Sequence, residues 1–437
     1  MEKIKSLFTN LKSFRWNMWI ALCALSLIPA TYQTIRTALA YVNTSASGID
    51  IIEQMEWYDL IDETLKALLI IPLYSILNRV NKEDNKNFSR FTFIALIIVF
   101  SLYFIFNIGV FFYGTSLIKA MNPSEVNIVA IKQYLELETI AFMIGIIPTF
   151  FNVIFVTINK AKNVYIFLII QAILGIIGDF ILIPNLGVNG IAINNIITNS
   201  ILAVAVFITL FLEKQITPSW FNKGDSKLIA NWCKIGLFSG LQQFIDNIVY
   251  ALMISRMVNL VAESGNYWVA NNFIWGWLLM PISSLSEIIK SDYKEEKNAN
   301  RSNYLMIVTF SIITWIITIP LWKPFLRYVE RIDNYQDIFS IIIKLWPFYI
   351  AYSLCIIPDS IFIGKGKTQY ILINSILVNF VYYGIWFILY ITNSIQFNML
   401  TIIMMFGFGM VFHLIISLVE LWVFDKKNKF SYKHTSI

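Results

Sequence analysis

The chain has 437 residues, of which 57% are hydrophobic and only 14% are charged, and its mean hydropathy is +0.66. An ordinary soluble domain has about 25% charged residues. The composition therefore excludes a soluble enzyme, a disordered protein and a nucleic-acid-binding protein. It also excludes a receptor with one span and a large ectodomain, because too little polar sequence remains to build one. The net charge of +6 fits basic residues retained on the cytoplasmic side of a membrane.

Apolar runs predict the secondary structure, because a membrane-spanning helix needs roughly 20 apolar residues. Their length excludes a barrel of short alternating strands. The expected fold is all-α: a polytopic integral membrane protein with twelve transmembrane helices. The expected spans cover residues 17–42, 57–79, 90–114, 134–158, 163–183, 188–213, 231–257, 267–288, 303–323, 338–363, 369–392 and 397–424.

The distribution of Lys and Arg predicts the orientation. The basic start leads into an apolar run without a clear cleavage site, which indicates an uncleaved first span. With the N-terminus inside, the predicted cytoplasmic segments carry 23 Lys and Arg residues. The predicted outside loops carry few, among them Lys119, Arg327 and Arg331. This positive-inside pattern predicts a multi-pass protein of the cell (plasma) membrane with both termini cytoplasmic.

A polar stretch at the midpoint of the chain predicts two halves. The turns Lys160-Ala161-Lys162 and Lys365-Gly366-Lys367 lie 205 positions apart at corresponding span ends. Repeats of six spans are a known transporter architecture. We therefore expect two pseudo-symmetric six-helix bundles. The expected division is an N-terminal bundle over 1–213, a cytoplasmic linker over 214–230 and a C-terminal bundle over 231–437.

Charged residues within spans are costly and usually face a cavity or a partner. In the second expected span, Asp59, Asp62, Glu63 and Lys66 share one helical face. Arg36 lies at a comparable depth in the first span, so it is expected to meet Asp62 or Glu63. Three interpretations remain open for this face: a solvated first turn, an internal network, or direct substrate contact.

A polar group in the seventh expected span surrounds Asp246, which lies near mid-membrane. Gln242, Gln243, Asn247 and Tyr250 accompany it, and the last three share a helical stripe. One interpretation is a structural hydrogen-bond cluster that joins the two bundles. The other is a site for substrate or a coupling ion, because a desolvated carboxylate can exchange protons near neutral pH.

Aromatic and amide side chains open the eighth expected span. Trp268, Asn271, Asn272 and Trp275 share one face. Aromatic faces near a carboxylate suit an organic cation, and Asn272 and Trp275 are the candidates for substrate contact. Trp268 has an alternative interpretation as an interfacial anchor.

Neither a metal site nor a catalytic centre is expected. Cys23, Cys233 and Cys355 lie far apart in apolar runs and are interpreted as small buried hydrophobes. His413 is the only histidine within a span, and it is expected to be packed rather than to relay protons. No Walker A pattern indicates ATP use. We expect no cofactor and no enzymatic activity.

Three short motifs lie near span ends. They are Gly364-x-Gly366-x-Thr368 after the tenth span, Leu186-Gly187-Val188-Asn189-Gly190-Ile191-Ala192 between the fifth and sixth, and Gly236-Leu237-Phe238 in the seventh, about ten residues before Asp246. Together they resemble motifs of the multidrug and toxic compound extrusion (MATE) transporters, of the multidrug/oligosaccharidyl-lipid/polysaccharide (MOP) flippase superfamily. Two departures concern acids. The family often has an acid near the end of the first span, and that position falls close to Asn43 here. The family also has an acid in the tenth span, and Asp359 lies in that span but in a different register.

The resemblance implies a secondary active antiporter that exports amphipathic organic compounds or drugs by alternating access, coupled to H⁺ or Na⁺. The partners are then the lipid bilayer and a small organic substrate that can be cationic, for a monomeric protein that binds no nucleic acid. One alternative is a flippase of the same superfamily that moves a lipid-linked oligosaccharide or polysaccharide, for which Arg36, Lys66 and Arg256 would supply positive charge. A minor alternative is a polytopic membrane transferase.

Overall fold

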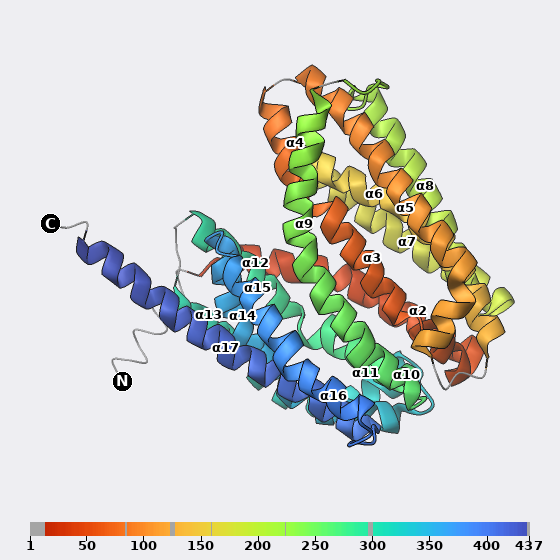
Figure 1. Cartoon of the computed structure of the whole chain (residues 1–437). Coiled ribbons are helices and arrows are strands. Elements are labelled where there is room, and N and C mark those ends of the chain that lie inside the picture. The colour runs from red at the N-terminus through yellow and green to blue at the C-terminus, as the bar shows by residue number, and fades with distance from the viewer. Residues whose placement is uncertain are drawn as a thin grey trace. The chain divides into compact units, whose positions relative to one another are not determined.

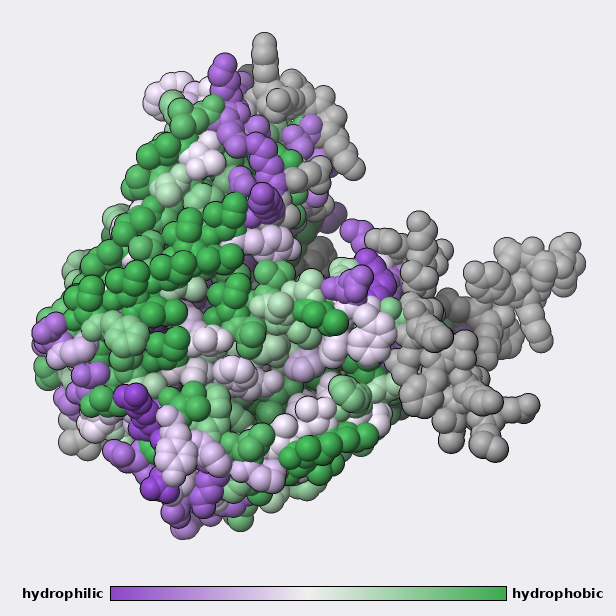
Figure 2. Space-filling view, turned by 180° about the vertical axis from the view of Figure 1, so that it is seen from behind, coloured by the Kyte–Doolittle hydropathy of each residue, from purple (hydrophilic) through white to green (hydrophobic). Residues whose placement is uncertain are grey.

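A computed structural model of the protein describes residues 14–83, 85–122, 127–158, 160–222, 224–295 and 300–434. Of the residues used in the charge count, Lys3, Lys5, Lys12, Lys223 and Lys297 lie outside these ranges. The described chain is helical, in agreement with the expected all-α class. Hydrophobic side chains cover broad parts of the face drawn in Figure 2, as expected for helices that contact lipid.

The helices follow one another with short connections (Figure 1). Within the described residues, four π-helical segments, η1 to η4, interrupt or extend them. In chain order they are α2 (Trp16–Glu53), α3 (Glu56–Leu69), α4 (Ile71–Glu83), α5 (Asn85–Met121), α6 (Ile128–Thr157), α7 (Ala161–Leu186), α8 (Val188–Leu212), α9 (Asp225–Tyr250), η1 (Ala251–Ser255), α10 (Arg256–Leu260), α11 (Ser264–Phe273), η2 (Ile274–Leu278), α12 (Met280–Glu295), α13 (Arg301–Pro324), η3 (Phe325–Val329), α14 (Tyr335–Gly364), α15 (Gln369–Ile376), η4 (Leu377–Tyr383), α16 (Gly384–Ile391) and α17 (Met399–His434).

Ten helical stretches within the described residues are long and apolar enough to cross a membrane. They match ten of the twelve expected spans, and the chain is a multi-pass membrane protein. The other two expected spans, 57–79 and 267–288, are helical but interrupted. The count of twelve and the cytoplasmic location of the termini stay predictions.

The first interruption separates α3 from α4, next to Pro72, which has no N–H to donate. The Leu73 amide bonds to the Ile70 carbonyl (3.1 Å) instead of to Leu69, four residues back. The freed Leu69 carbonyl accepts the indole N–H of Trp232 from α9, at 2.9 Å. The indole thus supplies a donor to a carbonyl that the break sets free, as a buried backbone group requires.

The second interruption, between η2 and α12, repeats this arrangement next to Pro281. The Ile282 amide bonds to the Leu279 carbonyl (3.0 Å), and the freed Leu278 carbonyl accepts the indole N–H of Trp315 from α13 (2.9 Å). Each of these residues except the tryptophan lies 209 positions after its counterpart in the first interruption. The two halves of the chain are thus built alike at this point, as the expected pseudo-symmetry requires.

The chain packs as two compact units. The N-terminal unit comprises Thr34–Gly265, and the C-terminal unit comprises Asn266–Ile437 together with Met1–Gln33. The expected linker matches a real gap in the helices, because α8 ends at Leu212 and α9 begins at Asp225. Packing nevertheless groups α9 with the N-terminal unit, where it contacts α3 and α4. The division into bundles over 1–213 and 231–437 stays a prediction.

The core of the N-terminal unit lies between α4, α5, α6, α8 and α9, and it is rich in phenylalanine. Phe88, Phe91, Phe150, Phe151 and Phe155 are all fully buried there. Arg90 of α5 fixes the start of α9 with a bidentate pair to Asp225, both contacts at 2.7 Å. In the C-terminal unit, α14 packs along α17 and α12. These cores hold the polar groups described next in fixed positions.

Candidate functional site

A buried ion pair joins α2 to α7 in the N-terminal unit. Arg36 donates to Asp179 through Nε at 2.8 Å and through Nη2 at 3.3 Å, and it also donates to Asn195 at 2.9 Å. Asp179 accepts a further bond from Asn194 at 2.7 Å. The expected pairing of Arg36 with Asp62 or Glu63 is therefore corrected. The Arg36 side chain contacts α7 and α8, and the periodicity of the sequence does not predict which neighbouring helices it meets.

The same polar layer continues to α6 through Glu138. The buried Glu138 carboxylate accepts the amide of Asn195 at 2.9 Å. Asn195 thus bridges Arg36 and Glu138. One cation consequently faces two buried carboxylates, Asp179 and Glu138.

A second network surrounds Asp62 of α3, which is 6% exposed. Its carboxylate pairs with Lys66 one turn later and accepts the Tyr103 hydroxyl of α5 at 2.9 Å. The ammonium of Lys66 also lies 5.9 Å from the centre of the Phe142 ring. Of the three interpretations of this face, these contacts favour an internal network for Asp62.

Acidic side chains outnumber basic ones around these networks. Electrostatic interactions link Asp59 to Glu56, Asp62 and Glu138, and link Glu56 to Glu53 and Glu63. Arg36 and Lys66 are the cations within the two networks described above. Four carboxylates here are buried, those of Glu53, Asp62, Glu138 and Asp179, whereas Glu56 is half-buried and Asp59 and Glu63 are exposed.

The polar stripe of α9 binds α3. Asn247 donates to the Leu60 carbonyl at 2.8 Å, to the Thr64 hydroxyl at 3.1 Å and to Glu63 at 3.5 Å. Gln243 donates in turn to Asn247 at 3.0 Å. These contacts favour the structural interpretation for Asn247 and Gln243. The candidates Gln242, Asp246 and Tyr250 are half-buried on the same helix.

An apolar pocket of about 480 Å³ lies beside Asn247. Ligand pockets usually measure about 300–1,000 Å³ and are mainly apolar with a few polar groups. Asn247 and Thr64 are the polar side chains in its lining. The other lining residues are Trp57, Leu60, Ile61, Leu65, Leu68, Phe106, Met121, Phe244, Ile248, Ala251 and Leu252.

The C-terminal unit places the predicted Trp275 in an aromatic cluster. Its indole N–H donates to the Tyr349 hydroxyl at 3.1 Å, and its ring contacts Tyr352 edge-on with centroids 5.2 Å apart. Tyr349 donates in turn to Asn271. Trp275 is 42% exposed and Asn272 is half-buried, so a part of this face is open to a ligand.

A second pocket of about 530 Å³ in the C-terminal unit is lined chiefly by aromatic rings. The indole N–H groups of Trp19, Trp315 and Trp322 all donate to protein oxygens. The pocket therefore suits an apolar group. Its lining residues are Trp19, Phe273, Trp277, Leu278, Pro281, Phe310, Ser311, Thr314, Trp315, Thr318, Leu321, Trp322 and Phe325.

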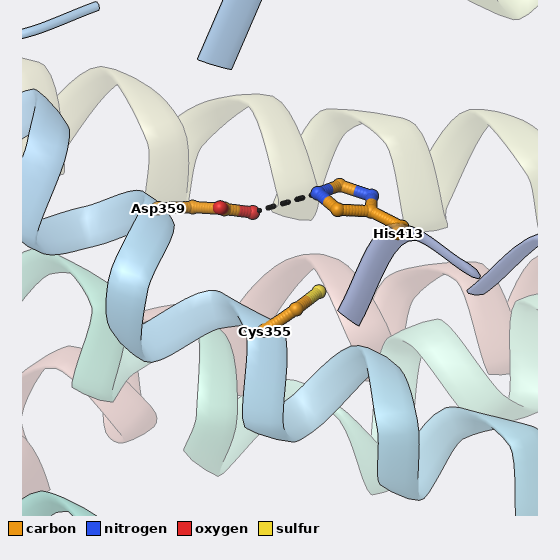
Figure 3. Close-up of side chains that lie close together, drawn as sticks. All are labelled: Cys355, Asp359 and His413. Carbon is orange, nitrogen blue, oxygen red and sulfur yellow. Dashed lines mark hydrogen bonds and ion pairs between the residues drawn. The ribbon is translucent and has the colours of Figure 1, made fainter. Parts of the chain in front are cut away.

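Asp359 of α14 meets α17. One carboxylate oxygen lies 3.1 Å from Nε2 of His413, and the other accepts the Ser417 hydroxyl at 2.9 Å. Figure 3 shows the carboxylate and the imidazole pointing toward each other, with Cys355 one turn away on α14. His413 is packed and hydrogen-bonded, as expected. Asp359 proves to be part of a polar cluster within the C-terminal unit.

Sequence reasoning missed several residues of these networks. Asp179 is an isolated charge by sequence spacing, yet it is the partner of Arg36. Glu138 lies near the end of a predicted span, which favours an interfacial position, yet its side chain is buried. A usable signal did exist: Asn194, Asn195 and Thr198 put three polar residues within two turns of an apolar span, and such residues usually meet partners inside a bundle.

Comparisons with known proteins bear on the fold. No protein-family model matches the sequence, and the search of curated proteins found no relative. Among solved structures, an inward-facing multidrug resistance MATE family transporter of the MOP superfamily matches with a TM-score of 0.72 at 16% identity, over 93% of this chain and 96% of that one.

Two further structures show the same likeness. A MOP superfamily transporter from Pyrococcus furiosus, described as having a binding pocket of reverse polarity and a suggested different function, matches with a TM-score of 0.65 at 16% identity, over 92% of this chain and 94% of that one. A mutant of the MATE transporter VcmN from Vibrio cholerae matches with a TM-score of 0.61 at 14% identity, over 98% of each chain. At these identities, the chain shares the fold of MATE transporters.

Proposed function

We propose that this protein is a secondary active transporter of the MATE type, which exports amphipathic organic compounds in exchange for H⁺ or Na⁺. The observation that carries the proposal is the excess of carboxylates around Arg36 and Lys66 in the N-terminal unit. Four of these carboxylates, at Glu53, Asp62, Glu138 and Asp179, are buried, and a buried excess over the two cations is stable only with bound protons or cations. They therefore offer a place where a coupling ion can bind and leave.

The two interrupted helices support a transport role. Interrupted hydrophobic segments at corresponding positions of two halves are typical of the binding regions of secondary transporters. Here Pro72 and Pro281 occupy corresponding positions, and at each break an indole N–H from another helix donates to a freed carbonyl. Each indole bond satisfies one carbonyl that the break sets free, and helices can bend at breaks of this kind. Alternating access then follows from movement of one unit against the other.

The substrate class follows from the open aromatic and apolar surfaces. Trp275 presents an exposed ring beside Tyr352 in the C-terminal unit, and a ring face attracts organic cations. Both pockets have volumes suited to an apolar ring system or chain. An amphipathic organic cation combines the two features. We propose that the protein acts as a monomer in the cell membrane with both termini cytoplasmic.

The flippase alternative needs free positive charge for a phosphate-bearing cargo. The cations that could supply it are engaged: Arg36 pairs with Asp179, Lys66 pairs with Asp62, and Arg256 donates to the Ala120 carbonyl at 3.0 Å. These contacts favour the antiporter over the flippase.

Reconstituted vesicles test the proposal. Efflux of a fluorescent organic cation is expected to require an imposed H⁺ or Na⁺ gradient. Asp246→Asn and Asp62→Asn are expected to abolish gradient-driven efflux while expression stays normal. Glu287→Gln is the matched control, because this exposed carboxylate pairs only with its neighbour Lys290 among the contacts described. Full efflux in both aspartate variants, or gradient-independent scrambling of a lipid-linked saccharide by the wild type, would refute the antiporter.

A further inference from the structure

Three different metal-ligating side chains meet where α14 packs on α17 in the C-terminal unit. The Cys355 thiol, the Asp359 carboxylate and the His413 imidazole each have a ligand atom within 4.8 Å of those of the other two (Figure 3). Cys355 is 1% exposed, and its thiol donates weakly to the Tyr352 carbonyl at 3.2 Å. Cys355 and Asp359 are one turn apart, so α14 presents both on the face that meets His413.

Around this group, buried oxygen acceptors lack donors. Both carboxylate oxygens of Glu420, which is 8% exposed, have no hydrogen-bond partner among the described residues. Glu420 lies on the same face of α17 as His413 and Ser417, and it interacts electrostatically with Asp359 and His413. The amide oxygen of Asn374 is also buried without a donor among the described residues, although its NH₂ group bonds to Ser417 at 2.7 Å.

The missing partner must therefore be positive or a donor. A carboxylate only accepts hydrogen bonds, and a buried acceptor left unpaired destabilises the fold, more so when it is charged. The Lys and Arg ion pairs described for the C-terminal unit join Arg15 to Asp292, Lys290 to Glu287 and Arg301 to Asp425. None of these reaches Asp359 or Glu420. This cluster thus differs from that of the N-terminal unit, where Arg36 supplies the counter-charge.

We propose that Cys355, Asp359 and His413 form a binding site for a divalent transition-metal ion of the Zn²⁺ class. A mixed sulfur, nitrogen and oxygen set is typical of such ions, whereas Mg²⁺, Ca²⁺ and Na⁺ prefer oxygen alone. Metal–ligand bonds of about 2.0–2.3 Å bring tetrahedral ligand atoms to roughly 3.5 Å from one another. The Asp359 and His413 atoms are already 3.1 Å apart, so the site reaches this spacing when the Cys355 thiol moves by about 1 Å.

The charge balance supports the assignment. Binding forms bonds from the metal to sulfur, nitrogen and oxygen, and the Cys355 thiol releases its proton to solvent. The two positive charges of the ion then offset the thiolate and the Asp359 carboxylate. Glu420 lies outside the group of three, and the ion would add positive charge to the surroundings of this carboxylate. The site does not rest on the proposed transport function, because it needs only the contacts within this unit.

Co²⁺ is the probe, because its absorption spectrum reports thiolate ligation and tetrahedral geometry. The full-length protein is purified through a tag without histidine, stripped of metal and titrated with Co²⁺ in detergent. The wild type is expected to bind one equivalent with a thiolate-to-cobalt charge-transfer band that Zn²⁺ abolishes. Calorimetry in buffers of different ionisation enthalpy is expected to show proton release on binding.

Variants at the ligands decide the assignment. Cys355→Ala and His413→Ala are each expected to weaken Co²⁺ binding at least tenfold, and Cys355→Ala also to remove the charge-transfer band. Cys233→Ala and His434→Ala are matched controls and are expected to bind as the wild type does. Size-exclusion profiles verify folding, and Cys355→Ser replaces Cys355→Ala if the latter aggregates. A wild type without the band, or unchanged affinity in both ligand variants, would overturn the site.

Discussion

The indole N–H of Trp232 donates to the Leu69 carbonyl at 2.9 Å, and this bond satisfies the backbone group that the break between α3 and α4 sets free. Trp315 does the same for Leu278 in the other half of the chain. Each proline-associated break is therefore stabilised by a hydrogen bond that a tryptophan of another helix donates to one of its freed carbonyls.

Loss of either indole donor should destabilise the fold. Trp232→Phe and Trp315→Phe each retain an aromatic ring but leave a buried carbonyl unpaired, which costs about 1–3 kcal/mol. Thermal unfolding of the purified protein in detergent is the measurement. Trp220→Phe, at a side chain that is 93% exposed, is the control and should leave the unfolding temperature unchanged. Equal unfolding temperatures for all three variants would contradict the role of the indole bonds.

The ion pair between Arg36 and Asp179 should show strong coupling. Its side chains are 14% and 1% exposed, so removal of one partner leaves a desolvated charge. Arg36→Met or Asp179→Leu alone is expected to cost about 3–5 kcal/mol, whereas the double variant should recover much of that loss. A double-mutant cycle on unfolding free energies measures the coupling. Additive losses in the double variant would show that the pair is not coupled.

Asn247 should contribute to stability through its bonds to α3. Asn247→Leu keeps the side-chain volume but removes donors to the Leu60 carbonyl and the Thr64 hydroxyl, so a loss of about 1–3 kcal/mol is expected. Gln242→Leu, at a half-buried position on the same helix, is the control, with an expected change within about 0.5 kcal/mol. Chemical unfolding followed by tryptophan fluorescence compares the two. A larger effect at Gln242 than at Asn247 would disprove the assignment.

Gly190 permits the close approach of α7 and α8. A Cβ added there would lie 2.5 Å from the backbone oxygen of Leu182 and 2.6 Å from its carbonyl carbon, and backbone atoms cannot move aside cheaply. Gly190→Ala should therefore reduce the yield of folded protein and lower its unfolding temperature. Gly109→Ala is the matched control, since no atom lies within 4 Å of its added Cβ. That control should be neutral or stabilise helix α5 by up to about 1 kcal/mol. Folded yield on size exclusion tests both.

Glu330 should make stability depend on pH. Burial raises the pKa of this carboxyl to about 8, and its Oε2 has no hydrogen-bond partner among the described residues. The folded state holds a proton that the unfolded chain releases above pH 4.5. Stability is therefore greatest at low pH and falls as pH rises toward 8, by on the order of 4 kcal/mol.

Thermal unfolding of wild type and Glu330→Gln between about pH 5 and pH 9 measures this effect, because that range brackets the loss of the proton. The wild type should lose stability with rising pH, and Glu330→Gln should be much less sensitive. Asp333→Asn, three residues later and exposed, should follow the wild type. A parallel pH dependence in wild type and Glu330→Gln would exclude Glu330 as its source.

The sequence by itself determined the helical class, most of the membrane spans and the likeness to MATE transporters. Continuous apolar runs are a local property, and in lipid they admit few structures, because every backbone group must be bonded internally. Ten of the twelve expected spans accordingly match long apolar helices. The spans 57–79 and 267–288 contain Pro72 and Pro281, but a proline alone does not fix whether a helix bends or breaks.

Only the tertiary structure decided which polar groups meet. Helical periodicity placed Asp59, Asp62, Glu63 and Lys66 on one face. It does not predict which residues of other helices that face contacts. Arg36 pairs with Asp179, which lies 143 positions along the chain, and Asp359 meets His413 across 54 positions. Such contacts depend on how distant helices pack and rotate against one another, which their own periodicity does not encode. For the same reason, periodicity could not predict the cluster that includes Cys355.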